Sequence, residues 1–410
     1  MRKQIALGAL ALTAAVVLAG CAGGGSSDNG DSESDGSGAE LVIWTDEERE
    51  QAIADAAAAF EEETGATVTL VKKNFEDLRN DFIAQVPTGE GPDITVGAHD
   101  WLGALVAAGV VDTIDLGDKA SEFEPVALEA MTYDGQLYAL PYSLETIALV
   151  QNVDLVGADA PASWDDMIQK GLASGAERPF VINTNGETGD GYTMYGFQTS
   201  FGAPVFVQDD SGSYTTEVGM GGAAGEAFAT WLGANGSAGT GYVSTTVDYD
   251  INNELFNTGK APYTIQGPWA ISAYPDVANI AVNPIPTAGG ETAAPFVGVQ
   301  GFYLSSQSKN ALLAQEFLVN YLGTEEAQRA LYEADPRIPA WSTLATEVSS
   351  DPIIAGFLAS AQNGVPMPSI PEMGSVWDLW NAAQSQIING ADPVSTWNTM
   401  VADVQAAVAG

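Results

Sequence analysis

Strand patterns alternate with helix patterns at the start of the folded region, and this alternation limits what the chain can fold into. The expected strands, rich in β-branched and aromatic residues, are Leu41–Thr45, Ala66–Val71 and Asp93–Val96. Each is followed by apolar residues at helical spacing, as in Ile53, Ala57 and Phe60. The pattern predicts an open α/β sheet, in which ligands bind at the carboxyl ends of the strands.

Two boundaries of the first helix can be read from its sequence. Thr45 or Asp46 is expected to cap its start, because a short polar side chain can accept hydrogen bonds from the free N–H groups of the first turn. Gly65 is expected to end the helix, since glycine adopts the left-handed backbone conformation that follows many helices.

The stretch Gly135–Asp154 contains two apolar strand-like runs and a single carboxylate, Glu145. Pro141 and Ser143 are expected to bend the backbone between the runs. Glu145 either points into water or is presented in a cleft where the chain passes from one domain to another. The remaining features of the sequence favour the second interpretation.

The composition limits the partners of the protein. A chain of 410 residues suits two domains of ordinary size. Its 13 Lys and Arg against 54 Asp and Glu give a formal charge of −41, and the acids are spread along the chain. Such a surface repels nucleic acid and anionic membrane, whereas a neutral ligand such as a sugar is not penalised.

The N-terminus has the features of a secreted lipoprotein. Met1–Gly20 joins two cations to an apolar run and predicts a signal peptide. Leu18–Cys21 resembles the bacterial lipobox, in which Cys21, the single cysteine, becomes the lipidated first residue. Residues 21–40 are expected to form a flexible linker rich in Gly, Ser and acid. The protein is therefore expected outside the bacterial cell membrane, held by its lipid only.

The pattern restarts after Glu145. Asn185–Tyr195 is expected to be a polar loop with aromatic residues. Further strands are expected at Phe180–Asn183 and Ala261–Ile265, and further helices at Ser163–Leu172, Ala223–Leu232, Ala311–Tyr321, Thr324–Ala334, 375–388 and 394–408.

Several aromatic residues of this second part are expected in loops, and some of them stand beside Gly or Pro. They are Tyr192, Tyr195, Tyr249, Trp269, Trp377 and Trp380. A core position is the ordinary alternative for each. Aromatic rings interleaved with acids and amides suit carbohydrate, because the C–H face of a sugar stacks on them and its hydroxyls bond carboxylates.

Catalytic interpretations are weaker. His99 stands alone, so no metal cluster of His and Cys is indicated. No nucleophile elbow or phosphate-binding loop is present. A glycosidase needs only two carboxylates facing one bond, and composition does not exclude it.

An ordered set of motifs resembles the maltose/maltodextrin-binding proteins of ABC importers. The motifs are LVIW (41–44), GPDITVGAHD (91–100), GQLYALPYSLET (135–146), TIQGPWA (264–270), PFVGV (295–299) and MPSIPEM (367–373). The resemblance implies an α/β type II periplasmic-binding-protein fold with two lobes. It places residues 41–143 and 300–346 in the N-terminal lobe, and 144–299 and 347–410 in the C-terminal lobe.

The resemblance also implies a set of ligand-binding residues. The carboxylates and the cation expected to bond sugar hydroxyls are Glu48, Arg49, Asp100, Glu145 and Asp190. The residues expected to stack on or line the sugar are Tyr192, Tyr249, Trp269, Met367 and Trp377.

This chain departs from the best-known family member at three positions. Gly97 replaces a third stacking tryptophan, and Trp101 and Asn381 replace arginines. Trp101 is expected to supply an aromatic surface by another route, so it joins the ligand-binding set.

Taken together, these features predict a monomeric, non-enzymatic solute-binding lipoprotein without cofactor or metal. It is expected to capture a maltodextrin-type oligosaccharide and deliver it to the permease subunits of an ABC importer. The alternatives are the same role for a different di- or oligosaccharide, a secreted glycosidase, and a polymer-binding adhesin without a transporter.

Overall fold

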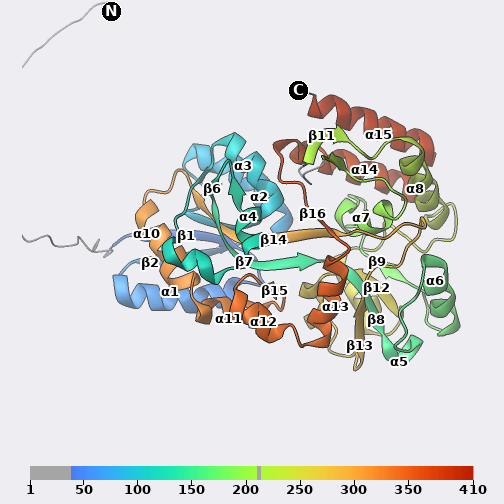
Figure 1. Cartoon of the computed structure of the whole chain (residues 1–410), viewed down its shortest axis with the longest axis horizontal. Helices are drawn as coiled ribbons and strands as arrows, with labels where there is room; N and C mark the ends of the chain where they lie inside the picture. The colour runs from blue at the N-terminus through green and yellow to red at the C-terminus, as the bar shows by residue number, and fades with distance from the viewer. Residues whose placement is uncertain (1–37, 210–213, 410) are drawn as a thin grey trace, which may run out of the picture. The chain divides into compact units, whose positions relative to one another are not determined.

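The computed structural model describes residues 38–209 and 214–409, which form two main β-sheets covered by helices (Figure 1). The expected signal peptide and Cys21 lie outside the described residues. Within the described ranges, no helix is both long and apolar enough to cross a membrane.

The first sheet contains the strands that open the sequence pattern. Its strands are β1 (Glu40–Thr45), β2 (Thr67–Lys72), β3 (Ile94–Ala98), β4 (Val111–Asp112), β7 (Ala139–Thr146), β14 (Phe296–Ser305), β15 (Ile338–Pro339) and β16 (Val365–Pro366). The order is β15-β7-β14-β3-β1-β2, and β4 and β16 also pair with β14. β1 is parallel to β2 and β3, whereas β14 runs antiparallel between β3 and β7 (Figure 1). A late segment of the chain therefore lies in the centre of an early sheet.

The second sheet begins at Ala148, and only Ile147 separates it from the end of β7. Its order is β13-β8-β12-β9, formed by β8 (Ala148–Asn152), β9 (Val181–Ile182), β12 (Tyr263–Gln266) and β13 (Ile280–Asn283). Two small antiparallel pairs complete the strands, β5 (Thr132–Tyr133) with β6 (Gln136–Leu137) and β10 (Phe206–Gln208) with β11 (Tyr214–Val218). The predicted passage between two α/β units near Glu145 thus coincides with the step from the first sheet to the second.

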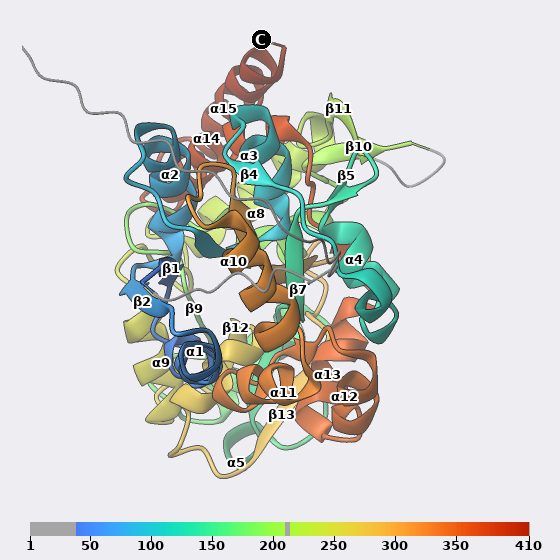
Figure 2. The same cartoon turned by 90° about the vertical axis from the view of Figure 1, so that its left-hand side faces the viewer.

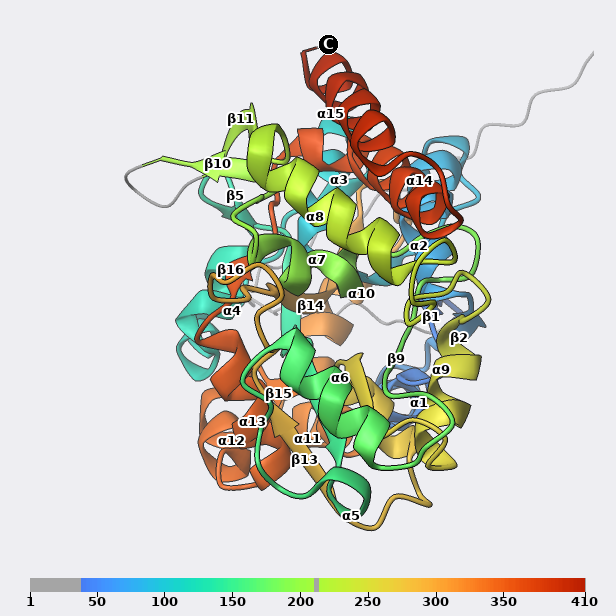
Figure 3. The ribbon, with the colours of Figure 1, turned by 90° about the vertical axis from the view of Figure 1, so that its right-hand side faces the viewer.

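Helices cover both sheets. The α-helices are α1 (Glu50–Thr64), α2 (Phe75–Gln85), α3 (Leu102–Ala108), α4 (Pro125–Ala130), α5 (Val153–Val156), α6 (Trp164–Ala173), α7 (Gly191–Thr199), α8 (Gly222–Asn235), α9 (Tyr249–Asn257), α10 (Ala311–Glu316), α11 (Glu325–Ala334), α12 (Ser342–Val348), α13 (Pro352–Ala361), α14 (Trp377–Ile388) and α15 (Pro393–Val408). The 3₁₀ helices are η1 (Val86–Thr88), η2 (His99–Trp101), η3 (Gly117–Glu122), η4 (Pro268–Ala273) and η6 (Pro371–Ser375), and η5 (Phe317–Leu322) is π-helical. In Figure 2, α1 lies beside α11, and in Figure 3, α8, α14 and α15 pack together.

The start of α1 differs from the prediction, whereas its end agrees. Gly65 follows the helix with φ +70°, as expected. Neither Thr45 nor Asp46 caps its start, because Arg49 holds the N-cap position without a side-chain bond. Asp46 instead accepts the N–H of Arg49 at 3.2 Å and pairs with its guanidinium. The turn between β1 and α1 therefore uses the carboxylate that the sequence had suggested for the cap.

The bend predicted at Pro141 and Ser143 coincides with an irregularity in the pairing of β7, although β7 continues through both residues. Gln300 of β14 pairs with Ser143, and Gly301 pairs with Pro141, so Tyr142 is an extra residue in the register. Proline lacks an N–H to donate, and such an irregularity is where a sheet tolerates it. The strand therefore carries Glu145 directly from the first sheet toward the second.

The prediction that six aromatic residues lie in loops is wrong, because Trp269 lies in η4 and the other five lie in α-helices. Asp190 accepts the N–H of Thr193 at 2.9 Å and starts α7, which shortens the expected polar loop and places Tyr195 in the core. Asp248 starts α9 in the same way, so Tyr249 is its first residue. Trp380 is fully buried in α14. The sequence contained a signal for α7 and α9. In each, an Asp that can cap a helix is followed by aromatic residues at helical spacing.

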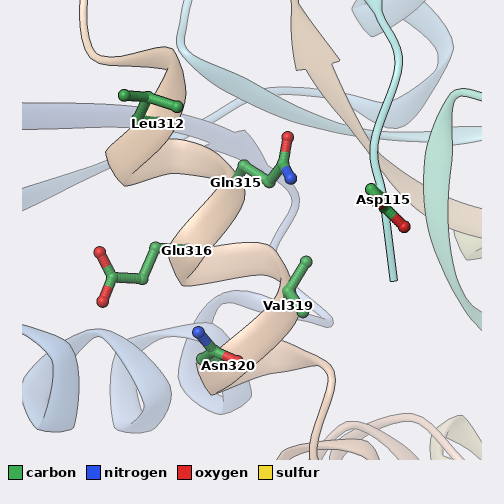
Figure 4. A pocket seen from close by; sticks show the side chains of 6 residues that line it. All are labelled: Asp115, Leu312, Gln315, Glu316, Val319 and Asn320. Atoms are coloured by element: carbon green, nitrogen blue, oxygen red, sulfur yellow. The ribbon is translucent and has the colours of Figure 1, made fainter. Parts of the chain in front are cut away.

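The packing of α1 gives a direct test of the first core. Phe60 is fully buried and meets Phe317 and Tyr321 edge to face, with ring centroids 5.3 and 5.0 Å apart. Phe60→Ala is expected to lower the free energy of unfolding by about 3–5 kcal/mol, because it leaves a cavity. Urea denaturation measures the change. Leu312→Ala on α10 is the control, since that side chain is 82% exposed (Figure 4) and its loss should change stability by under about 0.5 kcal/mol.

Candidate functional site

Glu145 and Gln300 form the centre of the candidate site, on the neighbouring strands β7 and β14. Gln300 donates its side-chain N–H to Glu145 Oε1 at 2.8 Å, and Glu145 is only 5% exposed. Gly298 lies opposite Glu145, and a Cβ there would approach Glu145 Cγ to 3.1 Å. The glycine therefore leaves room for a buried carboxylate between two strands.

Arg337 provides the counter-charge for this carboxylate. It directly precedes β15, which pairs with β7, so its guanidinium reaches Glu145. It also pairs with Asp335 and donates to Glu48 Oε2 at 3.0 Å. Burial opposes its charge, but Glu145 and Asp335 hold the pKa of Arg337 well above its usual value. These four residues form a network of three acids and one cation, called here the Arg337 cluster.

His99 fixes the end of β3. The Val299 N–H donates to His99 Nδ1 at 3.0 Å, so the ring proton is on Nε2, which donates to the carbonyl of Met367 at 3.0 Å. Burial lowers the pKa of His99 to about 4. The ring is therefore neutral near pH 7 and links β3, β14 and the segment after β16. This contact also accounts for the position of Met367, which is buried beside the site.

Asp100 follows His99 and is 5% exposed. Its Oδ1 is buried and accepts no hydrogen bond from the described residues. Burial raises the pKa of Asp100 to about 7, although the charge of Arg79 and a hydrogen bond from Trp377 act to lower it. An unpaired buried acceptor beside an indole is suited to a ligand hydroxyl.

Trp101 is packed tightly against the protein. Its ring centroid lies 5.0 Å from that of Phe75, and the residue is only 8% exposed. A Cβ on Gly97 would lie 2.6 Å from two Trp101 ring atoms. Trp101 therefore occupies the space that a side chain at position 97 would fill, and its ring is covered by Phe75 on one side.

The contact between Gly97 and Trp101 predicts the effect of a single methyl group. Gly97→Ala is expected to lower the free energy of unfolding by about 1–3 kcal/mol, because the indole must move. Chemical denaturation measures it. Gly374→Ala is the control, since a Cβ there has its nearest neighbour at 3.8 Å. A Gly97→Ala variant as stable as the control would show that Trp101 moves freely.

A row of aromatic rings lies beside these acids, and all are partly buried except Phe296, which is fully buried. Ring centroids of Tyr192 and Trp269 are 6.4 Å apart, those of Tyr192 and Phe296 6.2 Å, and those of Phe296 and Trp377 6.2 Å. The Tyr192 hydroxyl is buried and has no hydrogen-bond partner in the described ranges. Burial, with the nearby charge of Glu145, raises the pKa of Tyr192 well above its usual value. The row therefore adjoins the Arg337 cluster.

The other predicted site residues take different places. Glu48 lies at the edge of the Arg337 cluster with a partly exposed side chain. Tyr249 is close to it, because the charge of Glu48 adds to burial in raising the pKa of Tyr249. Arg49 is buried, pairs with Asp46 and donates its Nε–H to the Tyr142 hydroxyl. Asp190 accepts bonds from Thr193 and Asn183, the latter at 2.9 Å. The side chains of Arg49 and Asp190 are therefore already hydrogen-bonded to neighbouring residues of the protein.

Four residues of this site were absent from the prediction: Arg337, Gln300, Asp335 and Phe296. A usable signal existed for the first, because the chain has only 13 Lys and Arg. A rare cation beside Pro336 and an apolar strand is a candidate partner for a buried acid. Gln300 carried no signal of its own, since its role depends on the pairing of β14 with β7.

Two hollows on the surface lie away from the aromatic row. One of about 280 Å³ is lined by Asp115 and by residues of α10 and η5, as Figure 4 shows. Another of about 320 Å³ lies beside Leu144, Ile338 and Leu358. Neither contains a residue of the aromatic row. No group of three or more His, Cys, Asp or Glu in residues 38–209 and 214–409 is arranged to hold a metal ion.

Two sheets joined by adjacent strands, with buried acids and aromatic rings where the chain crosses between them, define a two-lobed solute-binding protein. The chain belongs to the bacterial extracellular solute-binding protein family, whose model matches residues 55–356. This assignment agrees with the predicted periplasmic-binding-protein fold.

Several characterised proteins are similar along most of the chain. A galactooligosaccharide-binding protein of Bacillus subtilis is 28% identical over 407 residues, covering 96% of this chain and 94% of that protein. A maltotriose-binding protein of Pyrococcus abyssi is 29% identical over 338 residues, covering 78% and 71%. The solved structure of Thermus thermophilus maltotriose-binding protein with maltotriose has a TM-score of 0.81 and 29% identity, covering 90% of this chain and all of that one.

Proposed function

We propose that this protein captures a maltooligosaccharide outside the cell and delivers it to an ABC permease without breaking a bond. The observation that carries the proposal concerns two buried polar atoms, Asp100 Oδ1 and the Tyr192 hydroxyl oxygen, which lie beside partly buried Trp rings. Neither atom has a hydrogen-bond partner within residues 38–209 and 214–409. A sugar satisfies both, because its hydroxyls bond the polar atoms while its C–H faces stack on indole.

The proposed site contains two kinds of side chain, aromatic rings that stack on sugar and carboxyl groups that accept hydrogen bonds from its hydroxyls. Trp269, Tyr192 and Trp377 offer ring surfaces, and Asp100, Glu145 and Glu48 offer carboxyl oxygens as acceptors. Micromolar affinity requires about 8 kcal/mol, which a few buried stacks and charge-assisted bonds can supply. The relatives named for maltotriose and maltodextrin support this ligand class.

A second candidate is a galactooligosaccharide, favoured by the Bacillus subtilis relative that covers 96% of this chain. The acids and rings described above suit either sugar, since both are neutral and rich in hydroxyls. The two differ in how the hydroxyls are oriented, which only binding measurements resolve.

The experiment is a tryptophan-fluorescence titration of residues 22–410, which omit the expected signal peptide and Cys21 and keep every described residue. Maltose, maltotriose and maltotetraose are compared with raffinose, galactobiose and xylotriose. Saturable binding of maltodextrins supports the proposal, and a response to galactosides alone replaces it with the second candidate. Chromatography after long incubation checks for products, and any turnover would identify a glycosidase instead.

We propose that the two lobes comprise residues 41–143 with 300–346, and 144–299 with 347–410. The sugar would be held between them, and contacts to both lobes at once would favour a closed state. Small-angle scattering with and without saturating sugar tests this, because closure reduces the radius of gyration. An unchanged radius with sugar bound would contradict it.

We propose further that the protein acts as a monomer anchored through lipidated Cys21. Relatives named as solute-binding lipoproteins support the anchor. Cys21→Ala should release the protein from the membrane fraction and abolish labelling by a radioactive fatty acid. Retention of the variant in the membrane fraction would overturn the assignment.

A further inference from the structure

Arg337 stands where residues from distant parts of the chain meet. It contacts Glu48 in the loop after β1, Glu145 in β7 and Asp335 at the end of α11. Its Cζ atom also lies 5.0 Å from the centroid of the Trp269 ring. Three of these four partners are residues that the sequence assigned to the sugar.

The guanidinium has donors left for a ligand. Arginine carries five N–H donors, and its bonds to Glu48, Glu145 and Asp335 use three of them, on Nη2, Nη1 and Nε. Two N–H groups remain, one on each Nη atom. Arg337 is 5% exposed, so these donors gain more from a hydroxyl acceptor than a donor already in water would.

The position over Trp269 limits how a sugar can use that ring. A cation on the face of an indole is attracted by the ring and covers it. Only the opposite face of Trp269 is then available for stacking. The guanidinium therefore sets both the orientation of the ring and the face that it presents.

We propose that Arg337 is a ligand-contacting and positioning residue of the carbohydrate site, which donates to a sugar oxygen while it holds Glu48, Glu145 and Trp269 in place. This inference rests on the proposed sugar-binding function. The arrangement also disfavours acidic sugars, because three carboxylates and one guanidinium leave a net charge of −2 at the point of contact. The ligand is therefore a neutral oligosaccharide.

The direct test observes the Arg337 side chain itself. Residues 22–410 contain five arginines, Arg49, Arg79, Arg178, Arg329 and Arg337. The side-chain Nε–H signals of the ¹⁵N-labelled protein are recorded with and without maltotriose, and Arg337→Lys identifies the signal of interest. The Arg337 signal is expected to shift on sugar addition, whereas that of surface Arg329 should stay fixed.

Affinity measurements on matched variants complete the test. Arg337→Lys keeps the charge but loses the planar fork, and is expected to weaken maltotriose binding about tenfold. Arg337→Gln is expected to weaken maltotriose binding further. Without the counter-charge the pKa of the neighbouring carboxyl groups rises, so this variant is expected to bind more weakly at pH 6 than at pH 8. Arg329→Lys is the control, because Arg329 makes the same kind of pairs, with Glu325 and Glu347, on the surface.

The outcomes separate this inference from the proposed function. If no sugar of the panel binds the parent protein, the proposed function fails. If maltotriose binds, but the Arg337 signal does not shift and Arg337→Lys binds as tightly as the parent, this inference alone is overturned. Circular dichroism of Arg337→Lys confirms that the variant is folded, so weaker binding reports on the site.

Discussion

Trp269→Ala is expected to weaken oligosaccharide binding by about 30- to 150-fold, equivalent to about 2–3 kcal/mol. Arg337 Cζ lies 5.0 Å from the centroid of the Trp269 ring, and Tyr192 lies beside the ring. We expect the face of Trp269 that Arg337 leaves uncovered to stack on the sugar. Its loss removes the stacking surface and releases Arg337 from its position. Isothermal titration calorimetry with maltotriose measures the change.

Trp269→Phe is the matched control for this result. Phenylalanine keeps a flat apolar face of smaller area, so the loss of affinity is expected to be about tenfold or less. Thermal unfolding without sugar should show that both variants fold. An alanine variant that binds within threefold of the parent protein would remove Trp269 from the site.

Asp100→Asn is expected to change how stability depends on pH. Burial raises the pKa of Asp100 to about 7, whereas an aspartate in an unfolded chain has a pKa of about 3.9. Between these values the folded protein binds more protons than the unfolded chain. The free energy of unfolding therefore falls as pH rises from about 4 to 7, by at most about 4 kcal/mol from this one group.

The variant removes this contribution, so its stability should vary less over the same range and exceed that of the parent protein at pH 8. Urea denaturation at pH 5, 6, 7 and 8 measures both slopes. Glu122→Gln in η3 is the control, because that side chain is exposed. Equal slopes for the Asp100→Asn variant and the parent would show that Asp100 is ionised throughout.

Sugar binding should depend on pH in the opposite direction. Hydroxyl groups that donate to Asp100 Oδ1 favour the charged carboxylate, so binding lowers the pKa of Asp100. Affinity for maltotriose is then expected to rise between about pH 6 and pH 8 in the parent protein. In Asp100→Asn the affinity should be lower and independent of this group, and calorimetry in buffers of different ionisation enthalpy detects the released proton.

Local sequence patterns were enough to predict many of the strands and helices. The three early strands and the helices after them follow from apolar spacing and from Gly65 and Gly109, which end their helices in the left-handed conformation. These features depend on neighbours within a few residues, so a single sequence contains them. The continuation of β7 through Pro141 could not be read locally, because it depends on the register with the distant strand β14.

The candidate site also contains residues that the sequence indicated correctly and residues whose surroundings it could not indicate. Residue types and order already pointed to Glu145, Asp100 and Trp269, and the structure brings all three beside the same aromatic row and charge network. For Trp101 and Asp190, the sequence indicated the position along the chain but not the environment. Phe75 covers the first, and the second caps α7.

The sequence by itself thus determined the α/β class, the approximate place where the chain passes between sheets, and the acids and rings near it. Only the tertiary structure decided which charges meet. Arg337 lies 192 residues from Glu145 and 289 from Glu48 along the chain, and it reaches them because β15 pairs with β7. Ion pairs form between groups that folding brings together, and that proximity depends on strand pairing across the whole sheet.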